Sequence, residues 1–155
     1  MGTVVSREDL ERLAESLRTQ GKTLVTTNGC FDLLHVGHVR ILKAARELGD
    51  ALIVGLNSDR SVAKLKGPTR PITPENDRAE ILASLACVDF VTIFDEDTPV
   101  EFLKLVKPNI HVKGSDYRAA DLEETPVVEG FGGRIALLDL VPDRSTSSIV
   151  SRIRL

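Results

Sequence analysis

Short apolar runs alternate with segments of helical periodicity along almost the whole sequence. The clearest run, residues 51–57 (ALIVGLN), is apolar at nearly every position, which is typical of a parallel strand buried on both faces. Consecutive parallel strands need long crossover connections, and these are usually helices. We therefore expect an α/β fold: a Rossmann-like, doubly wound, mainly parallel sheet with flanking helices.

The other predicted elements follow from the same periodicities and from turn residues. Ser6 can cap an N-terminal helix that stops at Gly21, with Ala14 and several leucines on its buried side. Further strands are expected over residues 23–28, 88–94, 109–114 and 135–141, and further helices over residues 36–48, after Asn57, from Pro74, over 100–107 and over 145–153. The number and length of these elements suit one domain.

Two helices carry a threonine–proline signal at their start. Thr73 is expected to cap a helix whose first turn contains Pro74, and Thr98 and Pro99 repeat the arrangement before residues 100–107. The helix after Pro74 is expected to bury a stripe made of Ala79, Leu82, Leu85 and Ala86. These signals predict where two crossover helices begin.

Composition limits the classes of function. The 155 residues carry a formal net charge of -3, which favours neither a polybasic nucleic-acid surface nor an acidic tail. Cys30 and Cys87 match no metal-binding spacing and indicate reduced thiols, and the polar N-terminus lacks the apolar region of a signal peptide. No apolar run approaches the ~18 residues of a membrane span. We therefore expect a cytoplasmic protein that binds neither nucleic acid nor a membrane.

Two histidines, His35 and His38, surround Gly37 where a predicted strand turns into a helix. If both lie in the first helical turn, they share one face, next to unpaired backbone N–H groups and the positive end of the helix dipole. Gly37 lacks a side chain, as does Gly29 in the preceding turn, so a phosphate can approach the backbone closely. The pattern predicts an anion site that would suit a triphosphate.

Two other interpretations of the histidine pair stay open from the residues alone. The histidines could be surface or satisfied structural side chains, because a bare motif is only a hypothesis. They could also bind zinc together with Cys30, since thiolate and imidazole are both zinc ligands. The sequence has neither the glutamate of an HExxH motif nor a second cysteine nearby, which disfavours the zinc site.

Five ordered motifs carry a family resemblance that covers nearly the whole chain from about Lys22. The segment TNGCFDLLHVGH resembles the HxGH signature of the cytidylyltransferase-like nucleotidyltransferase superfamily, and STSSI resembles its second, Ser/Thr-rich signature. Together with GLNSD, LKGPTRPI and HVKGSDY, these motifs are similar to the adenylyltransferase domain of bacterial ADP-heptose synthases. The resemblance implies a single nucleotidyltransferase domain over residues 1–155, with an N-terminal helix in residues 1–21 and a catalytic core in residues 22–155.

The resemblance implies an adenylyltransferase that joins AMP from ATP to a heptose 1-phosphate and releases pyrophosphate with the help of Mg²⁺. The product would be an ADP-heptose. The sugar kinase domain that is often fused in this family is expected on another protein. The metal ligands are left unassigned, because Mg²⁺ is usually held largely by the nucleotide phosphates. A homodimer is expected by analogy with the family.

The resemblance and the residue chemistry together assign roles to single residues. His35 and His38 would stabilise charge on the transferred phosphate and on the leaving group, and Lys66 would reach the phosphates from a loop, with Lys64 as its competitor. Arg78 is a candidate for phosphate binding or for a surface position, and guanidinium groups suit phosphate because they present a rigid fork of donors. The expected nucleotide-binding residues are Asn28, Gly29, Cys30, Phe31, Gly37, Lys113, Gly114, Ser145, Thr146 and Ser147, and the expected substrate-binding residues are Asp32, Asn57, Asp59, Arg70 and Arg78.

Two alternative functions are kept beside this one. A glycerol 3-phosphate cytidylyltransferase shares FDLLHxGH and a terminal ST-rich signature, but HVKGSDY departs from it, and Arg144 lies immediately before Ser145 instead of several residues earlier. A catalytically silent nucleotide-binding module is the other alternative. The joint presence of both histidines, Lys66 and the ST-rich turn disfavours it.

Overall fold

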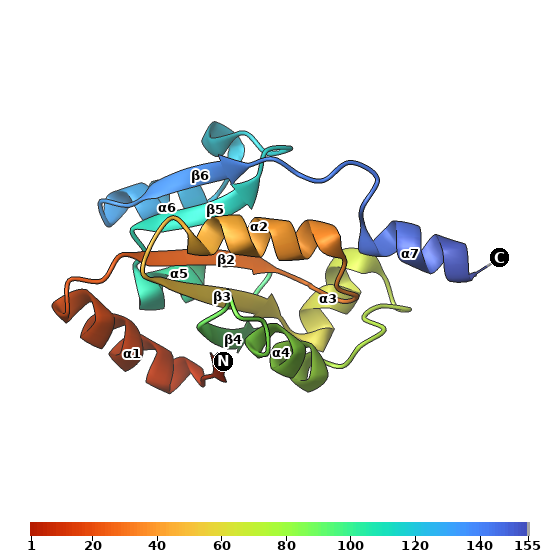
Figure 1. Ribbon diagram of the computed structural model, residues 1–155, viewed down its shortest axis with the longest axis horizontal. Helices are drawn as coiled ribbons and strands as arrows, with labels where there is room; N and C mark the ends of the chain where they lie inside the picture. The colour runs from red at the N-terminus through yellow and green to blue at the C-terminus, as the bar shows by residue number, and fades with distance from the viewer. Residues whose placement is uncertain (155) are drawn as a thin grey trace.

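Six parallel strands form one sheet between two layers of helices in the computed structural model, which describes residues 1–154 (Figure 1). The strands are β1 (Thr3–Val4), β2 (Leu24–Gly29), β3 (Ala51–Asn57), β4 (Phe90–Phe94), β5 (Ile110–Gly114) and β6 (Arg134–Leu138). The helices are α1 (Arg7–Thr19), α2 (Val36–Arg46), α3 (Asp59–Lys66), α4 (Glu75–Ala83), α5 (Val100–Val106), α6 (Glu124–Gly130) and α7 (Thr146–Ile153), with a short 3-10 helix η1 (Ala119–Asp121). The predicted Rossmann-like fold class is confirmed.

The strand order reverses beside β2. The order across the sheet is β1-β4-β3-β2-β5-β6, so the chain adds β3 and β4 on one side of β2 and returns to the other side for β5 and β6. Every neighbouring pair is parallel, so all carboxyl ends lie at one edge of the sheet. In doubly wound sheets, ligands bind beyond this edge where the order reverses. The carboxyl ends of β2 and β5 therefore mark the place that the fold favours for a site.

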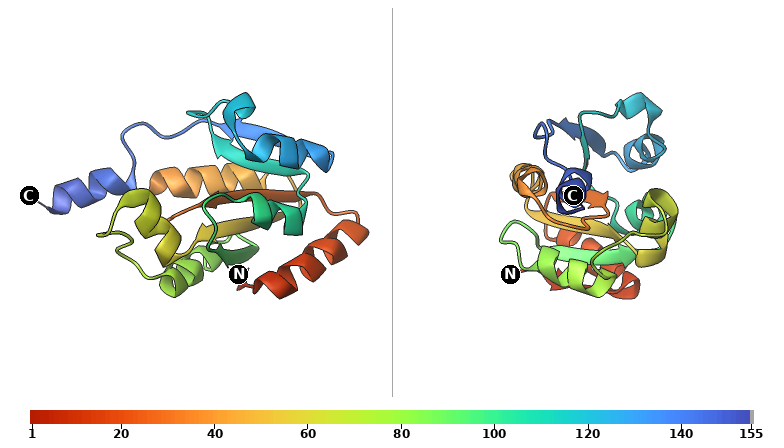
Figure 2. Two further views of the ribbon diagram at one scale, coloured as in Figure 1. Left: turned by 180° about the vertical axis from the view of Figure 1, so that it is seen from behind. Right: turned by 90° about the vertical axis from the view of Figure 1, so that its right-hand side faces the viewer.

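Alternate side chains of the strands fill two separate hydrophobic cores. On one face, Leu52, Val54 and Leu56 of β3 pack with side chains of α2 and α4. On the other face, Ala51 and Ile53 pack with side chains of α1, α5 and α6. The right-hand view of Figure 2 shows α2 on one side of the sheet and α6 on the other. A fully buried aliphatic side chain contributes about 1.5–3 kcal/mol by leaving water, so β3, which is buried along its whole length, is the centre of the fold.

The predicted cap of α4 is wrong. α4 begins at Glu75 with Pro74 at the N-cap position and no side-chain cap, so Thr73 lies one residue too early to cap it. The backbone N–H of Thr73 donates instead to the carboxylate of Asp32 at 2.9 Å. A contact with a residue more than forty positions earlier therefore takes Thr73 out of the helix, and local sequence cannot reveal such a contact.

The start of α5 and the buried stripe of α4 also differ from the prediction. Pro99 occupies the N-cap position of α5, and the side chain of Thr98 only accepts a long, 3.5 Å bond from the backbone N–H that follows the proline. α4 ends at Ala83, which is buried, and the helix stops before Leu85 and Ala86. Ala86 is exposed, because the turn after α4 carries it away from the core.

Three elements, β1, α6 and the short η1, were not predicted at all, and β6 is one of several elements that are shorter than predicted. β1 has two residues and pairs with β4 at the edge of the sheet, and α6 covers a segment that followed a polar stretch with no clear periodicity. The buried residues of α6 are Glu124 and Val128. Helix prediction depends on apolar residues at the buried positions, and in α6 one of these positions is occupied by a carboxylate. β6 ends at Leu138, three residues before the predicted end, because the chain leaves the sheet there.

The last helix lies beyond the carboxyl edge of the sheet. After β6 the chain follows an extended connection, and α7 projects past the ends of β2 and β3 in opposite views (Figures 1 and 2). The start of α7 thus reaches the same edge as the carboxyl ends of the strands.

Within the described residues 1–154, no helix is both long enough and apolar enough to cross a membrane.

We predict that His111 makes stability depend on pH. His111 of β5 is fully buried, and its Nδ1 lies 2.7 Å from the hydroxyl of Thr26. Burial, helped by the charge of Lys113, lowers the pKa of His111 from 6.5 to about 3. Below pH 6.5 only the unfolded chain takes up this proton, so the free energy of unfolding should fall by about 1.4 kcal/mol per pH unit towards pH 4.

Urea denaturation of the native protein and of a His111→Leu variant between pH 7 and pH 4.5 measures this contribution. The variant should lose stability less steeply below pH 6.5 than the native protein does, because a leucine takes up no proton. Equal slopes in the two proteins would show that His111 does not remain neutral in the folded state.

Candidate active site

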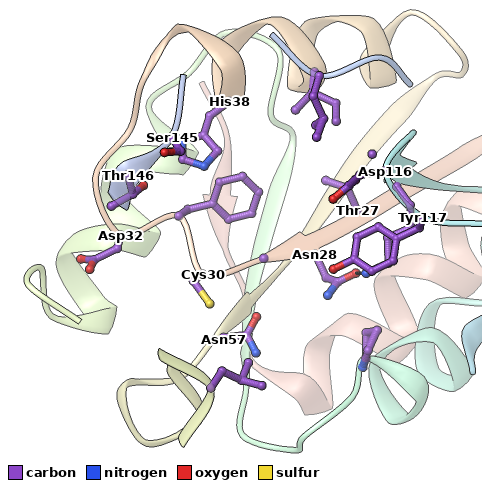
Figure 3. Close-up of a pocket in the computed structure, with 18 of the residues that line it drawn as sticks. Thr27, Asn28, Cys30, Asp32, His38, Asn57, Asp116, Tyr117, Ser145 and Thr146 are labelled. Atoms are coloured by element: carbon purple, nitrogen blue, oxygen red, sulfur yellow. Dashed lines mark hydrogen bonds between the residues drawn. The ribbon is translucent and has the colours of Figure 1, made fainter. Parts of the chain in front are cut away.

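A cavity of about 830 Å³ opens at the carboxyl edge of the sheet, where the strand order reverses between β2 and β5 (Figure 3). Most residues expected to act in catalysis or binding line it. They are Asn28, Gly29, Cys30, Phe31, Asp32, His35, Gly37, His38, Asn57, Lys66, Arg70, Lys113, Gly114, Ser145, Thr146 and Ser147. Two expected residues, Asp59 and Arg78, are not part of the lining. The fold thus gathers segments that are far apart in the sequence around one hollow.

The two histidine rings stack at the start of α2. Their centroids are 3.8 Å apart, and their planes are inclined by 30°. His35 occupies the N-cap position, and its Nδ1 accepts the backbone N–H of Gly37 at 3.1 Å. Nδ1 of His38 accepts the backbone N–H of His35 at 3.3 Å, and the ring of Phe31 packs against His38 with centroids 5.1 Å apart. Backbone and ring contacts therefore fix both imidazoles in place.

These hydrogen bonds determine where the imidazole protons lie. A backbone N–H can only donate, so Nδ1 of each ring accepts, and the proton of the neutral ring lies on Nε2. Burial lowers the pKa of His38 to about 4, with a smaller contribution from His35. Burial also lowers the pKa of His35. Both rings are therefore neutral at pH 7, and each can donate one hydrogen bond from Nε2.

Gly37 is needed at this turn because the ring of His35 leaves no room for a side chain there. A Cβ atom at position 37 would lie 2.8 Å from Cε1 of His35 and 3.6 Å from Cβ of Arg144. The N–H of Gly37 donates to Nδ1 of His35, so it is not one of the unpaired backbone N–H groups expected in this first turn. The anion donors that this turn presents are thus the Nε2–H groups of the rings, and Gly37 makes room for them.

The start of α7 lies against the same turn. Ser145 is the N-cap residue of α7, and its Oγ accepts the backbone N–H of Ser148 at 3.0 Å. The hydroxyl of Thr146 donates to the carbonyl oxygen of Leu33 at 2.9 Å and so ties α7 to the loop before α2. Figure 3 shows Ser145 beside His38. The two signatures singled out in the sequence therefore meet at one side of the cavity.

The carboxylate of Asp32 holds the loop that follows α3. It accepts the backbone N–H groups of Ile72 and Thr73, both at 2.9 Å, and Nε of Arg70 at 2.7 Å. Burial by itself raises the pKa of Asp32, but these hydrogen bonds outweigh that effect and hold the pKa below its usual range. Asp32 is therefore a charged anchor for the loop, and both of its oxygens already have partners.

Lys66 and Lys64 differ in their surroundings. Lys66, the last residue of α3, is exposed and lines the cavity. Lys64 forms an ion pair with Asp97 at 2.7 Å and lies outside the lining. Of the two lysines, Lys66 is the one placed to meet a ligand.

Arg78 is buried inside the protein, so the surface position considered for it is wrong. Its side chain has no exposed area. Nη1 donates to the carbonyl oxygens of Cys30 at 2.7 Å and Asn57 at 2.8 Å, Nε donates to that of Thr73 at 2.8 Å, and Nη2 donates to Asp59 at 2.8 Å. The guanidinium thus joins the ends of β2 and β3 to the start of α4, and the bonds that hold it there also hold Asp59 away from the cavity.

An ion pair that the sequence did not indicate lines another part of the cavity. Nζ of Lys113, on β5, lies 3.3 Å from Oε1 of Glu124, the first residue of α6, and donates to Oδ1 of Asn28 at 3.0 Å. The side chains are 12% and 8% exposed. The motif HVKGSDY pointed to Lys113, but Glu124 belongs to the helix that was not predicted, and only the fold brings it to β5.

The zinc alternative finds no support in the geometry. Within residues 1–154, no group of three His, Cys, Asp or Glu side chains is arranged to hold a metal ion. Burial raises the pKa of the Cys30 thiol, which disfavours the thiolate that zinc needs. His35 and His38 use Nδ1 for backbone hydrogen bonds.

Comparisons with known proteins agree with this arrangement. The sequence model of the cytidylyltransferase-like family matches residues 26–152. The chain is 54% identical over 147 residues to the bifunctional protein HldE of Syntrophotalea carbinolica, and the match covers 95% of this chain and 30% of that protein. It is 52% identical over 145 residues to the bifunctional protein HldE of Geotalea uraniireducens, and this match covers 94% of this chain and 30% of that protein. The chain thus spans about 30% of the length of these curated relatives.

Two solved structures are also similar. The lipopolysaccharide core biosynthesis protein from Thermoplasma volcanium GSS1 aligns with a TM-score of 0.63 and 30% identity over 78% of this chain and 98% of that chain. The pantoate-beta-alanine ligase from Francisella tularensis aligns with a TM-score of 0.66 and 19% identity over 95% of this chain and 69% of that chain. At that identity, the second likeness concerns the fold alone.

Proposed function

Because this chain belongs to the cytidylyltransferase-like family, we propose that it transfers AMP from ATP to a heptose 1-phosphate, releasing pyrophosphate and giving an ADP-heptose. We take residues 1–155 as one nucleotidyltransferase domain. The observation that carries the proposal is the meeting of the His35–His38 turn, Lys66 and the start of α7 around one cavity. The resemblance to the adenylyltransferase domain of ADP-heptose synthases supports the choice of adenine and of a heptose.

The proposed reaction needs no nucleophile from the protein. An oxygen of the acceptor's phosphate monoester is already anionic near neutral pH and would attack the α-phosphorus of ATP. A new O–P bond forms, the bond from the α-phosphorus to the bridging oxygen breaks, and the electron pair leaves with pyrophosphate. Catalysis then depends on positioning and on stabilising negative charge, as in phosphoryl transfer generally.

The residues around the cavity suit these two tasks. The neutral rings of His35 and His38 would donate from Nε2 to the oxygens on which charge develops, without the repulsion that two imidazolium groups would suffer at 3.8 Å. Lys66 would neutralise charge on the leaving pyrophosphate. Ser145 and its neighbours at the start of α7 would offer hydroxyl and N–H donors to the phosphates.

A magnesium ion would fit as a companion of the nucleotide. Several carboxylates line the cavity, and those of Asp32, Asp97 and Glu124 already have partners in Arg70, Lys64 and Lys113. The ion would therefore be held mainly by ATP phosphates and water. When bound, Mg²⁺ would offset the charge of the triphosphate. The residues of the chain would orient that complex through Lys66 and the two histidines.

Pyrophosphate release tests the proposal. The purified protein is incubated with Mg²⁺, one of ATP, CTP, GTP or UTP, and one of a panel of sugar 1-phosphates or glycerol 3-phosphate. We expect turnover with ATP and a heptose 1-phosphate and a much lower rate when either is omitted or replaced. Preference for CTP with glycerol 3-phosphate would overturn the heptose assignment. Tight ATP binding without turnover on any acceptor would point to the silent module.

A further inference from the structure

Lys113 and Glu124 form a nearly buried ion pair that the proposed mechanism does not use. Both side chains line the cavity, and they are 12% and 8% exposed. Lys113 belongs to β5, and Glu124 begins α6. Val112 packs on the face of the sheet that α2 covers, and neighbouring residues of a strand point to opposite faces. Lys113 therefore points to the face opposite α2 and the histidines. A buried pair contributes little stability by itself, so its presence in a cavity calls for another explanation.

The pair leaves hydrogen-bonding capacity free. Lys113 has three N–H donors, of which Asn28 takes one, and Oε1 of Glu124 lies 3.3 Å away as its ion-pair partner. Within the described residues 1–154, neither carboxylate oxygen of Glu124 accepts a hydrogen bond, although the residue is only 6% exposed and pairs with Lys113 by charge. The amide nitrogen of Asn28 is also without a partner within that part of the chain. An N–H donor of Lys113, a carboxylate acceptor of Glu124 and the amide N–H of Asn28 are thus available for hydrogen bonds at the wall of the cavity.

Charge divides the cavity into two parts. The end of α3, the loop after it and the start of α7 contribute the cations Lys66, Arg70 and Arg144, of which Arg70 is paired with Asp32. The segment from residue 116 to residue 124 contributes four acidic residues, Asp116, Asp121, Glu123 and Glu124. Carboxylates repel phosphate, so the phosphates of a ligand would lie on the cationic side. The part around Lys113 suits an uncharged group that both donates and accepts hydrogen bonds.

We propose that Lys113, Glu124 and Asn28 form a subsite for the vicinal hydroxyl groups of a sugar ring. One hydroxyl would donate to Oε2 of Glu124 and accept from Lys113, and its neighbour would accept from Asn28. The ring of Tyr117, which lies 5.4 Å from Nζ of Lys113 and beside Asn28 in Figure 3, would cover the sugar. The subsite rests on the proposed function and deepens it, because it would distinguish hydroxylated from deoxygenated substrates.

Two parts of the proposed substrates carry such a diol. One is the ribose of ATP, and the other is the ring of the acceptor sugar. The chemistry of recognition is the same for both, so binding measurements must separate them. Isothermal titration calorimetry with ATP, 2′-deoxy-ATP and 3′-deoxy-ATP examines the ribose, and titration with mannose 1-phosphate and 2-deoxyglucose 1-phosphate, in the presence of a non-hydrolysable ATP analogue, examines the acceptor ring.

The native protein should bind the deoxygenated ligand about tenfold more weakly in one of the two series, since a hydrogen bond to a charged group is lost. In Glu124→Gln this ratio should fall to within about twofold. Glu129→Gln, which removes the same charge from an exposed position on α6, should keep the native ratio. The series that shows discrimination identifies the sugar that is recognised.

Equal ratios in the native protein and in Glu124→Gln would overturn the proposal, as would a native protein that discriminates in neither series. If the uncompensated charge of Lys113 unfolds Glu124→Gln, the double variant Lys113→Gln, Glu124→Gln removes both charges and is titrated in its place. Binding needs no turnover, so absence of pyrophosphate release would count against the proposed function while leaving this measurement intact.

Discussion

Replacing His38 with alanine is expected to lower kcat for pyrophosphate release by about a hundredfold to a thousandfold, with a much smaller change in the Kd of ATP. The ring is held by the N–H of His35 and by Phe31, so its Nε2–H is oriented before the ligand arrives. A fixed donor stabilises the charge that develops in the transition state more than it stabilises bound ATP. Steady-state kinetics at saturating ATP and calorimetric titration of ATP measure the two quantities separately.

His38→Gln is the informative partner of this variant. The side-chain amide of glutamine can place an N–H near the position of Nε2, so it should recover part of the lost kcat. A structural defect would leave both variants equally slow and would lower their thermal stability. If His38→Ala weakens ATP binding as much as it lowers kcat, the histidine is a binding group without a special role in the chemical step.

Replacing Arg78 with methionine should reduce the free energy of unfolding by about 3–5 kcal/mol. Methionine fills a similar volume but donates no hydrogen bond. The carbonyl oxygens of Cys30, Asn57 and Thr73 would lose their shared donor. Each buried carbonyl group left without a donor costs about 1–3 kcal/mol. The carboxylate of Asp59 adds less to the loss, because its side chain is 42% exposed and can be hydrated. Urea denaturation followed by circular dichroism measures the loss.

The matched control is Arg60→Met. Arg60 also pairs with an aspartate at 2.9 Å, but its side chain is 82% exposed. Surface ion pairs contribute about 0–1 kcal/mol, so this variant should be close to the native protein. Arg78→Lys separates charge from geometry, because one ammonium group cannot reach three carbonyl oxygens in different directions. A loss for Arg78→Met no larger than that for Arg60→Met would show that the buried guanidinium does not hold these segments together.

The elements that sequence reasoning predicted well share a simple property. β3 is apolar throughout and is buried throughout, and α1 begins after Ser6, whose side chain caps it as expected. Local preferences and tertiary packing favour the same structure in these segments, so the pattern alone was sufficient. The position of the histidine turn between β2 and α2 was predicted for the same reason.

The errors lie where a distant residue decides a local feature. Thr73 has the chemistry of a cap, but the carboxylate of Asp32 takes its N–H. Arg78 has the chemistry of a surface or phosphate-binding residue, but three carbonyl oxygens from separate segments surround it. α6 was missed because one of its two buried residues is Glu124, whose charge is compensated by Lys113 on another element.

The sequence by itself determined the alternation of strands and helices, the fold class that follows from it, and the two signatures around His35 and Ser145, because these depend on periodicity and on residue types close together in the chain. Only the tertiary structure decided which hydrogen-bond donors are available to a ligand and which already have partners within the protein. It assigned the N–H of Gly37 to His35, Arg78 to the protein interior, and Lys113 to Glu124. Hydrogen bonds and ion pairs act over a few ångströms in space, and crossover connections bring together residues that sequence distance keeps apart.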